Sequence, residues 1–574
     1  MIRFPRHEGG DVSVVICGAA GQGIQTVEDL LVQVLRVEGY HVFGSREYMS
    51  RVRGGNNSTE IRVSSRPVRA LVDRIDLLIP LNGGVRANII ERIDEGTIII
   101  GDGEELGTEF AGYEDQFLNA PVLEEARQVG GKVYASVIAA GILAGLFDVS
   151  TGPVESYFEK RFGAKGDKIV AQNREALDRG LTMARRLLEK GRFSLAVRPN
   201  PQESRIAVNG TDAVGLGALA GGCNLVTAYP MSPASGVLSF MAQKARDFGV
   251  VVEQVEDEIA AINWAVGGAY AGARPLVTTS GGGFALMTEG LSLAAVMEAP
   301  VVVHLAQRPG PATGMATRTE QADLELALYG GHGEFPRVIF APGSLGEAFD
   351  LTRRAFDLAS RFQSPAIVLT DQYFVNSFYD LPPFDVGREL PKSYLVEAGP
   401  DYRRYAESPD GISPMAVPGH GEGLVGADSH EHDEVGHVYE DFHLRKRMND
   451  KRLRKAEAIF AETLAPTLIG PDDYRDLVIC WGSTRHIVEE ALDELDRPGL
   501  AMLHFAQVWP LHGDTAGLLG RAERVVAVEG NATAQLARLI RRETGIEIKE
   551  KLLNYSGLQF SVEKVREGLR DLLS

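Results

Sequence analysis

Apolar runs alternate with amphipathic stretches along most of the chain. Near the N-terminus, DVSVVIC at 11–17 is a continuous apolar run typical of a buried strand, and TVEDLLVQVLRVEGY at 26–40 has helical spacing. HVFGS at 41–45 is a second expected strand. Two further apolar strands are expected at 75–81 and 96–102. The pattern predicts a parallel or mixed sheet flanked by helices.

The same alternation returns twice further along. A second α/β pattern, with apolar strands such as PLVTT and PVVVHLA, is followed by a third that starts with DLVICW. Between them, residues 386–470 are rich in Gly, Pro, Asp, Glu and His and show little periodicity apart from a charged helix at 451–464. We therefore predict an α/β chain with α/β domains at 1–195, 205–385 and 471–574. The segment 386–470 is expected to be an extended connection.

The composition indicates a globular protein and disfavours several kinds of partner and site. The chain has 574 residues, of which 44% are apolar and 24% charged, as expected of a globular protein with ample core. Its net charge of −19 disfavours binding to nucleic acid or to an anionic membrane, because both require a positive field. The cysteines, Cys17, Cys223 and Cys480, stand far apart. We expect no disulfide framework, no iron–sulfur cluster or thiolate zinc site held by this chain alone, no signal peptide, no membrane span, and a reducing, cytoplasmic setting.

Two glycine-rich segments of the first domain are candidates for anion binding. Gly18–Gly23 (GAAGQG) lies between a strand and a helix, where backbone N–H groups can hold a phosphate. Ala20 replaces the second glycine of a dinucleotide fingerprint, so a dinucleotide site, an anion or acyl-carrier contact and a structural turn all stay open. Arg51–Asn57 (RVRGGNN) is either an anion clamp or a solvated loop. Gly101–Gly103 (GDG) lacks the later Asn of a diphosphate–magnesium motif, and we interpret it as a turn.

Polar segments also mark the strand ends of the second domain. Tyr229–Ser235 (YPMSPAS), Thr278–Gly283 (TTSGGG) and Arg308–Thr317 (RPGPATGMAT) each follow an apolar run. Each has an ordinary explanation as a proline turn, a strand-end loop or a solvated arginine. A fixed guanidinium with hydroxyls nearby would also suit a small carboxylate substrate.

Three acids gather in QVEDE at 254–258, directly before a Gly/Ala-rich helix. Capping of the helix dipole is their ordinary role. One carboxylate pointed into a subunit cleft could instead bind a protonatable ring nitrogen.

Five of the twelve histidines fall within one irregular stretch. They are His420, His430, His432, His437 and His443. Their spacings match no compact zinc pattern, so we interpret the stretch as a surface loop, with a metal site as the alternative.

Taken in order, the motifs resemble the alpha subunit of 2-oxoacid:ferredoxin oxidoreductases. The resemblance rests on YPMSPAS, EDEIAAINWAVGGAYAGA, TSGGGF and RPGPATGMATRTEQADL. It is nearest to the 2-oxoglutarate form, in which a gamma domain is fused ahead of the alpha domain; GAAGQG and RGG are similar to that gamma domain. The resemblance implies a Rossmann-like gamma domain, a pyrimidine-side thiamine-diphosphate-binding domain and a transketolase C-terminal-like domain, the last carried by WGST and VEGN.

The resemblance also implies the chemistry. Such enzymes decarboxylate a 2-oxoacid with thiamine diphosphate, transfer the acyl group to coenzyme A and pass electrons to ferredoxin. A separate beta subunit carries the diphosphate side, Mg²⁺ and a [4Fe–4S] cluster, so this chain is expected to act within an (αβ)₂ assembly. The preferred substrate is 2-oxoglutarate, which gives succinyl-CoA and CO₂, or the reverse carboxylation. Pyruvate, branched-chain or aryl 2-oxoacids, and a non-catalytic scaffold, are the alternatives.

Site residues follow from the resemblance position by position. Glu258 matches the glutamate that hydrogen-bonds the aminopyrimidine ring, with Glu256 as its local competitor, and Tyr229 and Pro230 lie on the cofactor loop. Substrate contacts are implied for Ser232, Arg308 and Thr317. An anion or coenzyme A contact is implied for Gly21, Gln22, Gly23 and Arg53. Ser232 stands where the family has Thr, and Met231 where it has Ile, so the identity of the oxoacid is open.

Overall fold

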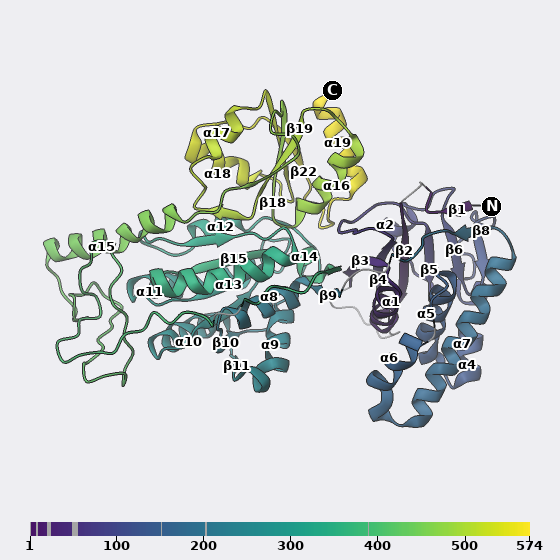
Figure 1. The fold of residues 1–574 in the computed structure, drawn as a ribbon, viewed down its shortest axis with the longest axis horizontal. Helices are drawn as coiled ribbons and strands as arrows, with labels where there is room; N and C mark the ends of the chain where they lie inside the picture. Colours follow the sequence, from purple (N-terminus) through teal and green to yellow (C-terminus); the bar gives the residue numbers. More distant parts are fainter. Residues whose placement is uncertain are drawn as a thin grey trace. The chain divides into compact units, whose positions relative to one another are not determined.

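The computed structural model describes residues 2–6, 10–19, 24–48, 55–150, 152–200, 204–387 and 390–574 (Figure 1). The chain forms two compact units. The first contains Met1–Val208 together with Ser377–Pro383, and the second contains Asn209–Asn376 together with Phe384–Ser574. Sheets flanked by helices make up both units, so the predicted α/β class is confirmed.

The first unit is built on a mixed sheet. Among the described residues its strand order is β7 (Phe117–Asn119), β6 (Ile98–Gly101), β5 (Leu77–Pro80), β2 (Asp11–Ala19), β4 (Asn56–Ser64), β3 (His41–Glu47), β16 (Phe378–Leu381) and β9 (Ile206–Asn209). Strand β2 pairs in parallel with β5 and antiparallel with β4. Alternate residues of β2 join hydrophobic clusters on opposite faces, for example Val14 on one and Val15 on the other. Burial on both faces explains why most of this strand, from Val14 to Cys17, is apolar.

Helices α1 (Ile24–Glu38), α5 (Ala135–Leu146) and α7 (Asp167–Glu189) contribute to the larger of these clusters. Helices α5 and α7 approach closely through Gly141 and Gly180. A Cβ atom added at Gly141 would lie 2.5 Å from the carbonyl oxygen of Leu177, so a larger residue would separate the helices.

The segment 377–383 belongs to the first unit, although it follows the second α/β pattern in the sequence. Strand β16 pairs antiparallel with β3. Its buried Asp380 accepts a hydrogen bond from the backbone N–H of Val42 at 2.9 Å and lies 2.9 Å from Nδ1 of His41. The domain boundaries at 195, 205, 385 and 471 stay predictions.

The second unit contains two sheets. The larger has the order β11 (Val251–Gln254), β10 (Leu225–Ala228), β12 (Pro275–Thr279), β13 (Val302–Gln307), β15 (Ala366–Asp371), β14 (Val338–Phe340) and β20 (Gln507–Trp509) over the part of the chain described. All pairings are parallel except that of β14 with β20. The smaller has the order β17 (Thr467–Ile469), β19 (Leu500–Phe505), β18 (Asp476–Trp481), β21 (Arg524–Glu529) and β22 (Glu550–Leu553). One hydrophobic core joins residues of both sheets.

The connection after residue 386 is largely irregular, as predicted, and leads into helix α15 (Phe442–Ala461). Of its histidines, His432 is fully buried and packs on Tyr405 with 3.9 Å between ring centroids. The interpretation of the whole histidine stretch as a surface loop was therefore wrong for His432. The other four are exposed.

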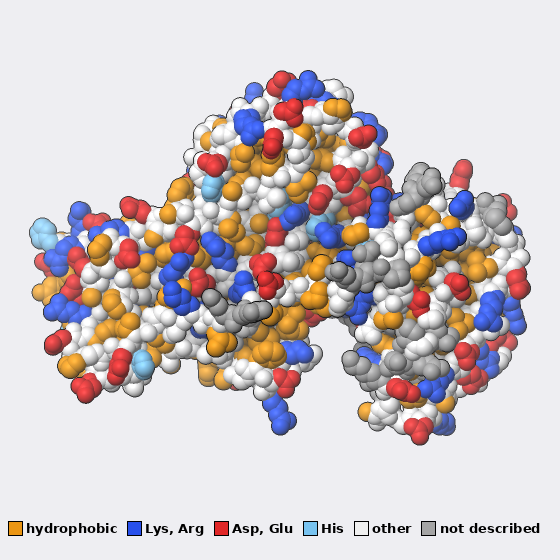
Figure 2. Space-filling model, in the orientation of Figure 1, with side chains coloured by type: hydrophobic (Ala, Val, Ile, Leu, Met, Phe, Trp, Pro, Cys, Tyr) orange, Lys and Arg blue, Asp and Glu red, His pale blue; other side chains and the backbone are white. Residues whose placement is uncertain are grey.

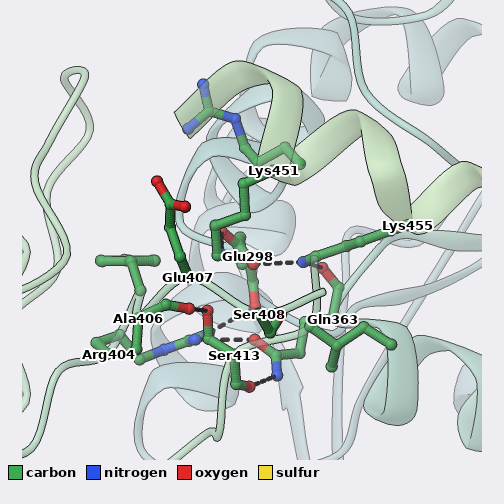
Figure 3. A network of polar contacts seen from close by, with 12 residues as sticks. Glu298, Gln363, Arg404, Ala406, Glu407, Ser408, Ser413, Lys451 and Lys455 are labelled. Atoms are coloured by element: carbon green, nitrogen blue, oxygen red, sulfur yellow. Dashed lines mark hydrogen bonds and ion pairs between the residues drawn. The ribbon is translucent and has the colours of Figure 1, made fainter. Parts of the chain in front are cut away.

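A buried ion cluster joins α15 to the turn between α11 (Gly281–Val296) and β13 (Figure 3). Glu298, just after α11, lies 2.6 Å from Nζ of Lys451 and also binds Lys455. All three side chains are almost completely buried. Arg404 of the connection donates to the backbone carbonyl of Glu298 at 2.8 Å and to Oε1 of Gln363 at 2.8 Å. The cluster therefore fixes both the helix and the irregular connection.

Burial alone would raise the pKa of Glu298. The ammonium groups of Lys455 and Lys451, with the Arg404 guanidinium, outweigh this effect and hold the pKa well below its usual range. Glu298 is therefore a carboxylate at neutral pH.

On the face in Figure 2, acidic and basic side chains are interspersed over the surface. None of the helices in the described part of the chain is both long enough and apolar enough to cross a membrane.

Candidate functional site

Three adjacent parallel strands bring the predicted polar loops to one edge of the larger sheet. Strand β10 ends at Ala228, before YPMSPAS; β12 ends at Thr279, before the three glycines; and β13 ends at Gln307, before Arg308. Because the carboxyl ends of parallel strands meet at one edge, segments separated by tens of residues become neighbours there.

The three acids at the start of α10 (Glu258–Tyr270) have different surroundings. Asp257 caps the helix, accepting a hydrogen bond from the backbone N–H of Ala260 at 2.7 Å. Glu256 is exposed, whereas Glu258 is only 3% exposed. Within the described residues, Oε1 of Glu258 is buried and has no hydrogen-bond partner. Buried carboxylate oxygens are usually bonded, so this atom is suited to a donor from a bound molecule.

Three parts of the site lie against the glycines at the start of α11. A Cβ atom at Gly283 would lie 2.8 Å from Oε1 of Glu258, and one at Gly281 would collide with the Asp323 carboxylate. At Gly282 it would lie 3.7 Å from the carbonyl oxygen of Ala312, in the Arg308–Thr317 loop. The missing side chains therefore let Glu258, this loop and Asp323 approach the same helix end.

Arg308 and the YPMSPAS loop are joined directly. Nη1 of Arg308 donates to the backbone carbonyl of Ser232 at 2.7 Å. Thr317, at the other end of the arginine loop, is 8% exposed, whereas Tyr229 and Pro230 are exposed. The candidate anion contacts of the first domain, Gly21, Gln22, Gly23 and Arg53, lie outside the described residues.

A buried histidine beneath the loops was not found from the sequence. Thr278 donates to the carbonyl of Ala234 at 3.2 Å, so its hydroxyl is free to accept from Nδ1–H of His304 at 2.9 Å. Nε2 of His304 then accepts from the Thr370 hydroxyl at 2.9 Å. Burial lowers the pKa of His304 to about 3, so the ring is neutral and can make both contacts. This chain of hydrogen bonds fixes the YPMSPAS loop to the sheet.

The C-terminal part of the second unit fixes the other side of the arginine loop. The side chain of Gln321 donates to the carbonyl of Trp481 at 2.9 Å and accepts from the backbone N–H of Gly530 at 2.8 Å. The backbone N–H of Thr319 donates to the carbonyl of Gly557 at 3.1 Å. The smaller sheet thus determines the position of the segment that returns from Arg308 and Thr317.

The close contact at Gly283 gives a stability prediction. Gly283→Ala is expected to lower the free energy of unfolding by about 1–3 kcal/mol, because the added methyl group must displace Glu258 or Thr279. Gly282→Ala, one residue away with its nearest neighbour at 3.7 Å, should be neutral or stabilising by up to about 1 kcal/mol. Urea unfolding of both variants measures the difference; equal effects would contradict the packing described.

The arrangement combines a buried carboxyl oxygen, which has no partner among the described residues, with a guanidinium loop at one edge of the parallel strands. It can bind a nitrogenous ring through Glu258 and a small carboxylate through Arg308. No group of three or more His, Cys, Asp or Glu side chains in the described part of the chain is placed to hold a metal ion.

Known proteins are similar to this chain along most of its length. Residues 216–451 match a family model described as pyruvate flavodoxin/ferredoxin oxidoreductase, thiamine diphosphate-binding, and residues 13–183 match pyruvate ferredoxin/flavodoxin oxidoreductase. The alpha subunit of 2-oxoacid:ferredoxin oxidoreductase 2 from Aeropyrum pernix is 31% identical, over 95% of each chain. The 2-oxoglutarate oxidoreductase subunit KorA of Mycobacterium tuberculosis is 27% identical, over 98% of this chain and 92% of that protein.

A solved structure is similar along the whole length. It is the 2-oxoglutarate:ferredoxin oxidoreductase from Magnetococcus marinus with 2-oxoglutarate, coenzyme A and succinyl-CoA bound. Its chain superposes with a TM-score of 0.90 at 29% identity, and the match covers 99% of this chain and 100% of that one. The resemblance seen in the sequence is thereby confirmed, together with the predicted thiamine-diphosphate-binding domain. The chain belongs to the 2-oxoacid:ferredoxin oxidoreductase family as an alpha subunit.

Proposed function

We propose that this chain, with a beta subunit, catalyses the coenzyme A-dependent oxidative decarboxylation of 2-oxoglutarate to succinyl-CoA and CO₂, or the reverse carboxylation, with ferredoxin as electron carrier. The choice of 2-oxoglutarate is supported by the names of the Magnetococcus and Mycobacterium relatives, which match nearly the whole chain. The single observation that carries the catalytic assignment is Oε1 of Glu258, which is buried, has no hydrogen-bond partner among the described residues and lies against Gly283.

Glu258 would hold the aminopyrimidine ring of thiamine diphosphate. A buried carboxyl oxygen without a partner fits a ring nitrogen that shares a proton with it, and the exposed Glu256 offers no such enclosed position. When bound, thiamine diphosphate supplies the electron sink that cleavage next to a keto group requires. Tyr229 and Pro230, exposed on the loop after β10, would contact the cofactor at the open side of the site.

Arg308 would bind the carboxylate of the 2-oxoacid. Its bond to the Ser232 carbonyl fixes the guanidinium toward the YPMSPAS loop, and the Ser232 and Thr317 hydroxyls are the nearby candidates for further substrate contacts. The proposed coenzyme A contacts at Gly21, Gln22, Gly23 and Arg53 rest on the sequence.

A beta subunit would complete the site with the diphosphate side, Mg²⁺ and the [4Fe–4S] cluster, in an (αβ)₂ assembly. Two observations support this division. The three cysteines of this chain are buried, in or beside separate strands, where they form no cluster. Apolar side chains on α10 and α11 near Glu258 are exposed, namely Ile259, Trp264 and Leu286, as expected of a surface that a partner covers. A cytoplasmic location fits these reduced cysteines.

Arg308→Ala is expected to raise the KM for the 2-oxoacid by about 10- to 150-fold, the effect of losing about 1.5–3 kcal/mol of charge-assisted hydrogen bonding. Arg308→Lys keeps the charge but not the planar fork, so its KM should fall between those of the wild type and the alanine variant. The measurement is steady-state acceptor reduction with the reconstituted complex. An unchanged KM in the alanine variant would remove Arg308 from the substrate site.

The substrate preference is tested with a panel of 2-oxoacids. The wild-type complex should show its highest kcat/KM with 2-oxoglutarate in coenzyme A-dependent reduction of a low-potential acceptor. Equal or higher values with pyruvate, branched-chain or aryl 2-oxoacids would contradict the preference for 2-oxoglutarate. A stable, cofactor-loaded complex without turnover on any of them would indicate a scaffold.

A further inference from the structure

The arginine loop, with the residues that follow it up to Gln321, is anchored at both ends. Directly before Arg308, Nε2 of Gln307 donates to the carbonyl of Thr370 in β15 at 3.1 Å, and Oε1 of Gln307 accepts the backbone N–H of Asp323 at 2.9 Å. At the other end, Gln321 binds the smaller sheet. The proposed function gives a role to the arginine loop and none to Gln321.

Gln321 binds the carboxyl ends of two adjacent parallel strands. Its Nε2 donates to the carbonyl of Trp481, the last residue of β18, at 2.9 Å. Its Oε1 accepts from the N–H of Gly530, directly after β21, at 2.8 Å, and its backbone N–H donates to the carbonyl of Gly530 at 2.6 Å. The residue is only 2% exposed. A buried amide that is bonded at both its nitrogen and its oxygen is held in one orientation.

The space around the Gln321 amide is tightly filled. A Cβ atom added at Gly482 would lie 3.0 Å from Nε2 of Gln321, and one added at Gly530 would lie 3.0 Å from Oε1. The two glycines therefore allow the amide to reach the strand ends. A methyl group at Gly530 would displace Gln321 by a few tenths of an ångström.

A displacement at Gln321 would reach the substrate contacts through a loop that is folded on itself. The N–H of Met315 donates to the carbonyl of Pro309 at 3.1 Å, and the N–H of Arg318 donates to the carbonyl of Met315 at 3.0 Å. Thr317 is only four residues from Gln321. Because these internal bonds join its two ends, the loop is expected to shift as one piece when either anchor moves.

We propose that Gln321 is a positioning residue, which by binding the smaller sheet holds the arginine loop in the place from which it binds the 2-oxoacid. This inference rests on the proposed function and extends its substrate site to the C-terminal part of the second unit. Thr319 adds further anchors, because its backbone N–H donates to the carbonyl of Gly557 at 3.1 Å and its hydroxyl donates to Asp371 at 3.1 Å. Loss of the Gln321 bonds should therefore shift the loop without releasing it.

Gln321→Met keeps the length of the side chain and removes both of its hydrogen bonds. In the reconstituted complex it should raise the KM for 2-oxoglutarate about 5- to 30-fold, the factor that one or two net hydrogen bonds supply, with a much smaller change in kcat. Gly530→Ala displaces Gln321 from the other side and should raise KM by a smaller factor, and it tests the same contact if Gln321→Met does not fold. An unchanged KM in both variants would overturn the proposal.

Gln507→Met is the matched control. Gln507 is also buried, accepts from the backbone N–H of Leu464 at 3.0 Å and donates to the carbonyl of Pro510 at 3.3 Å, but none of these groups belongs to the arginine loop. Its substitution should lower the free energy of unfolding in urea by a similar amount and leave KM unchanged. An equal rise of KM in Gln507→Met would show that any weakening of this unit raises KM, and a positioning role for Gln321 would be wrong.

A second measurement requires no turnover. Amide hydrogen exchange of the full chain, followed by mass spectrometry over peptides that cover 309–321, reports how firmly the loop is anchored. Gln321→Met should speed exchange there, above all at the amides of Arg318 and Thr319, whereas Gln507→Met should not. Unchanged exchange in Gln321→Met would contradict the anchoring role.

The outcomes separate the inference from the proposed function. If 2-oxoglutarate is turned over with the same KM by the wild type, Gln321→Met and Gly530→Ala, the positioning role is wrong and the proposed function stands. If no 2-oxoacid is turned over by the loaded wild-type complex, the proposed function fails and the role of Gln321 fails with it, whatever the exchange data show.

Discussion

Glu258→Gln is expected to lower the rate of 2-oxoacid-dependent acceptor reduction by about 10²- to 10⁴-fold, the usual contribution of a positioned acid–base group. Glutamine keeps the shape of the side chain but cannot share a proton with a ring nitrogen. Since Oε1 of Glu258 has no hydrogen-bond partner within the described part of the chain, the substitution breaks no structural bond at that atom. The fold and the assembly with the beta subunit should persist, as checked by size-exclusion chromatography and thermal unfolding.

Glu256→Gln is the matched control for this prediction. Glu256 lies two residues away, carries the same functional group and is exposed, so its substitution should leave the rate close to that of the wild type. A normal rate in Glu258→Gln, or a larger loss in Glu256→Gln, would show that the wrong carboxylate has been assigned to the cofactor.

Glu298→Gln is expected to destabilise the protein by about 3–5 kcal/mol, because it leaves buried ammonium groups without their counter-charge. Lys451 and Lys455 lie four residues apart on one face of α15 and share the single Glu298 carboxylate (Figure 3). A loss of this size is a large part of the stability of an ordinary domain. Urea unfolding followed by circular dichroism measures it.

The same helix provides the control. Asp450 pairs with Lys446 at 3.5 Å on the exposed side of α15, and Asp450→Asn should cost no more than about 0.5 kcal/mol. If Glu298→Gln does not fold, a variant that also carries Lys451→Met and Lys455→Met should recover soluble, folded protein, since both buried ammonium groups are then removed together with their counter-charge. Failure of that variant to recover, or equal effects of the two single substitutions, would contradict the account of the cluster.

The elements most easily predicted were the apolar strands of the parallel sheets. Strands such as β2 and β18 are buried on both faces, so their sequences are mainly apolar and easily recognised. Strand β4 was missed, because NNSTEIRVS is polar although nearly all of it is buried. Its Arg62 pairs with Asp11 at 2.7 Å and its Glu60 with Arg92 at 2.6 Å. Ion pairs between residues far apart in sequence leave no periodic signal.

Parts of the site could be predicted because strand ends carry recognisable motifs. Arg308 and the YPMSPAS loop were found in this way, and the structure joins them. Glu258 was preferred to Glu256 from the sequence, and the burial of Glu258 beside an exposed Glu256 supports that preference. His304 was missed, since a single histidine in a strand looks ordinary until its neighbours are known. Asp323 lies within the motif at 308–324, but nothing in the sequence assigned it a role. Glu298 and Lys451, 153 residues apart, are another such case.

The central claim is that this chain holds one half of a divided active site. The most direct test measures coenzyme A-dependent, 2-oxoglutarate-dependent reduction of a low-potential acceptor by the alpha chain, by the beta chain and by the two together, with thiamine diphosphate and Mg²⁺ present. We expect turnover only when both chains are present. Turnover by either chain alone, or none by a stable and fully loaded complex, would contradict the claim.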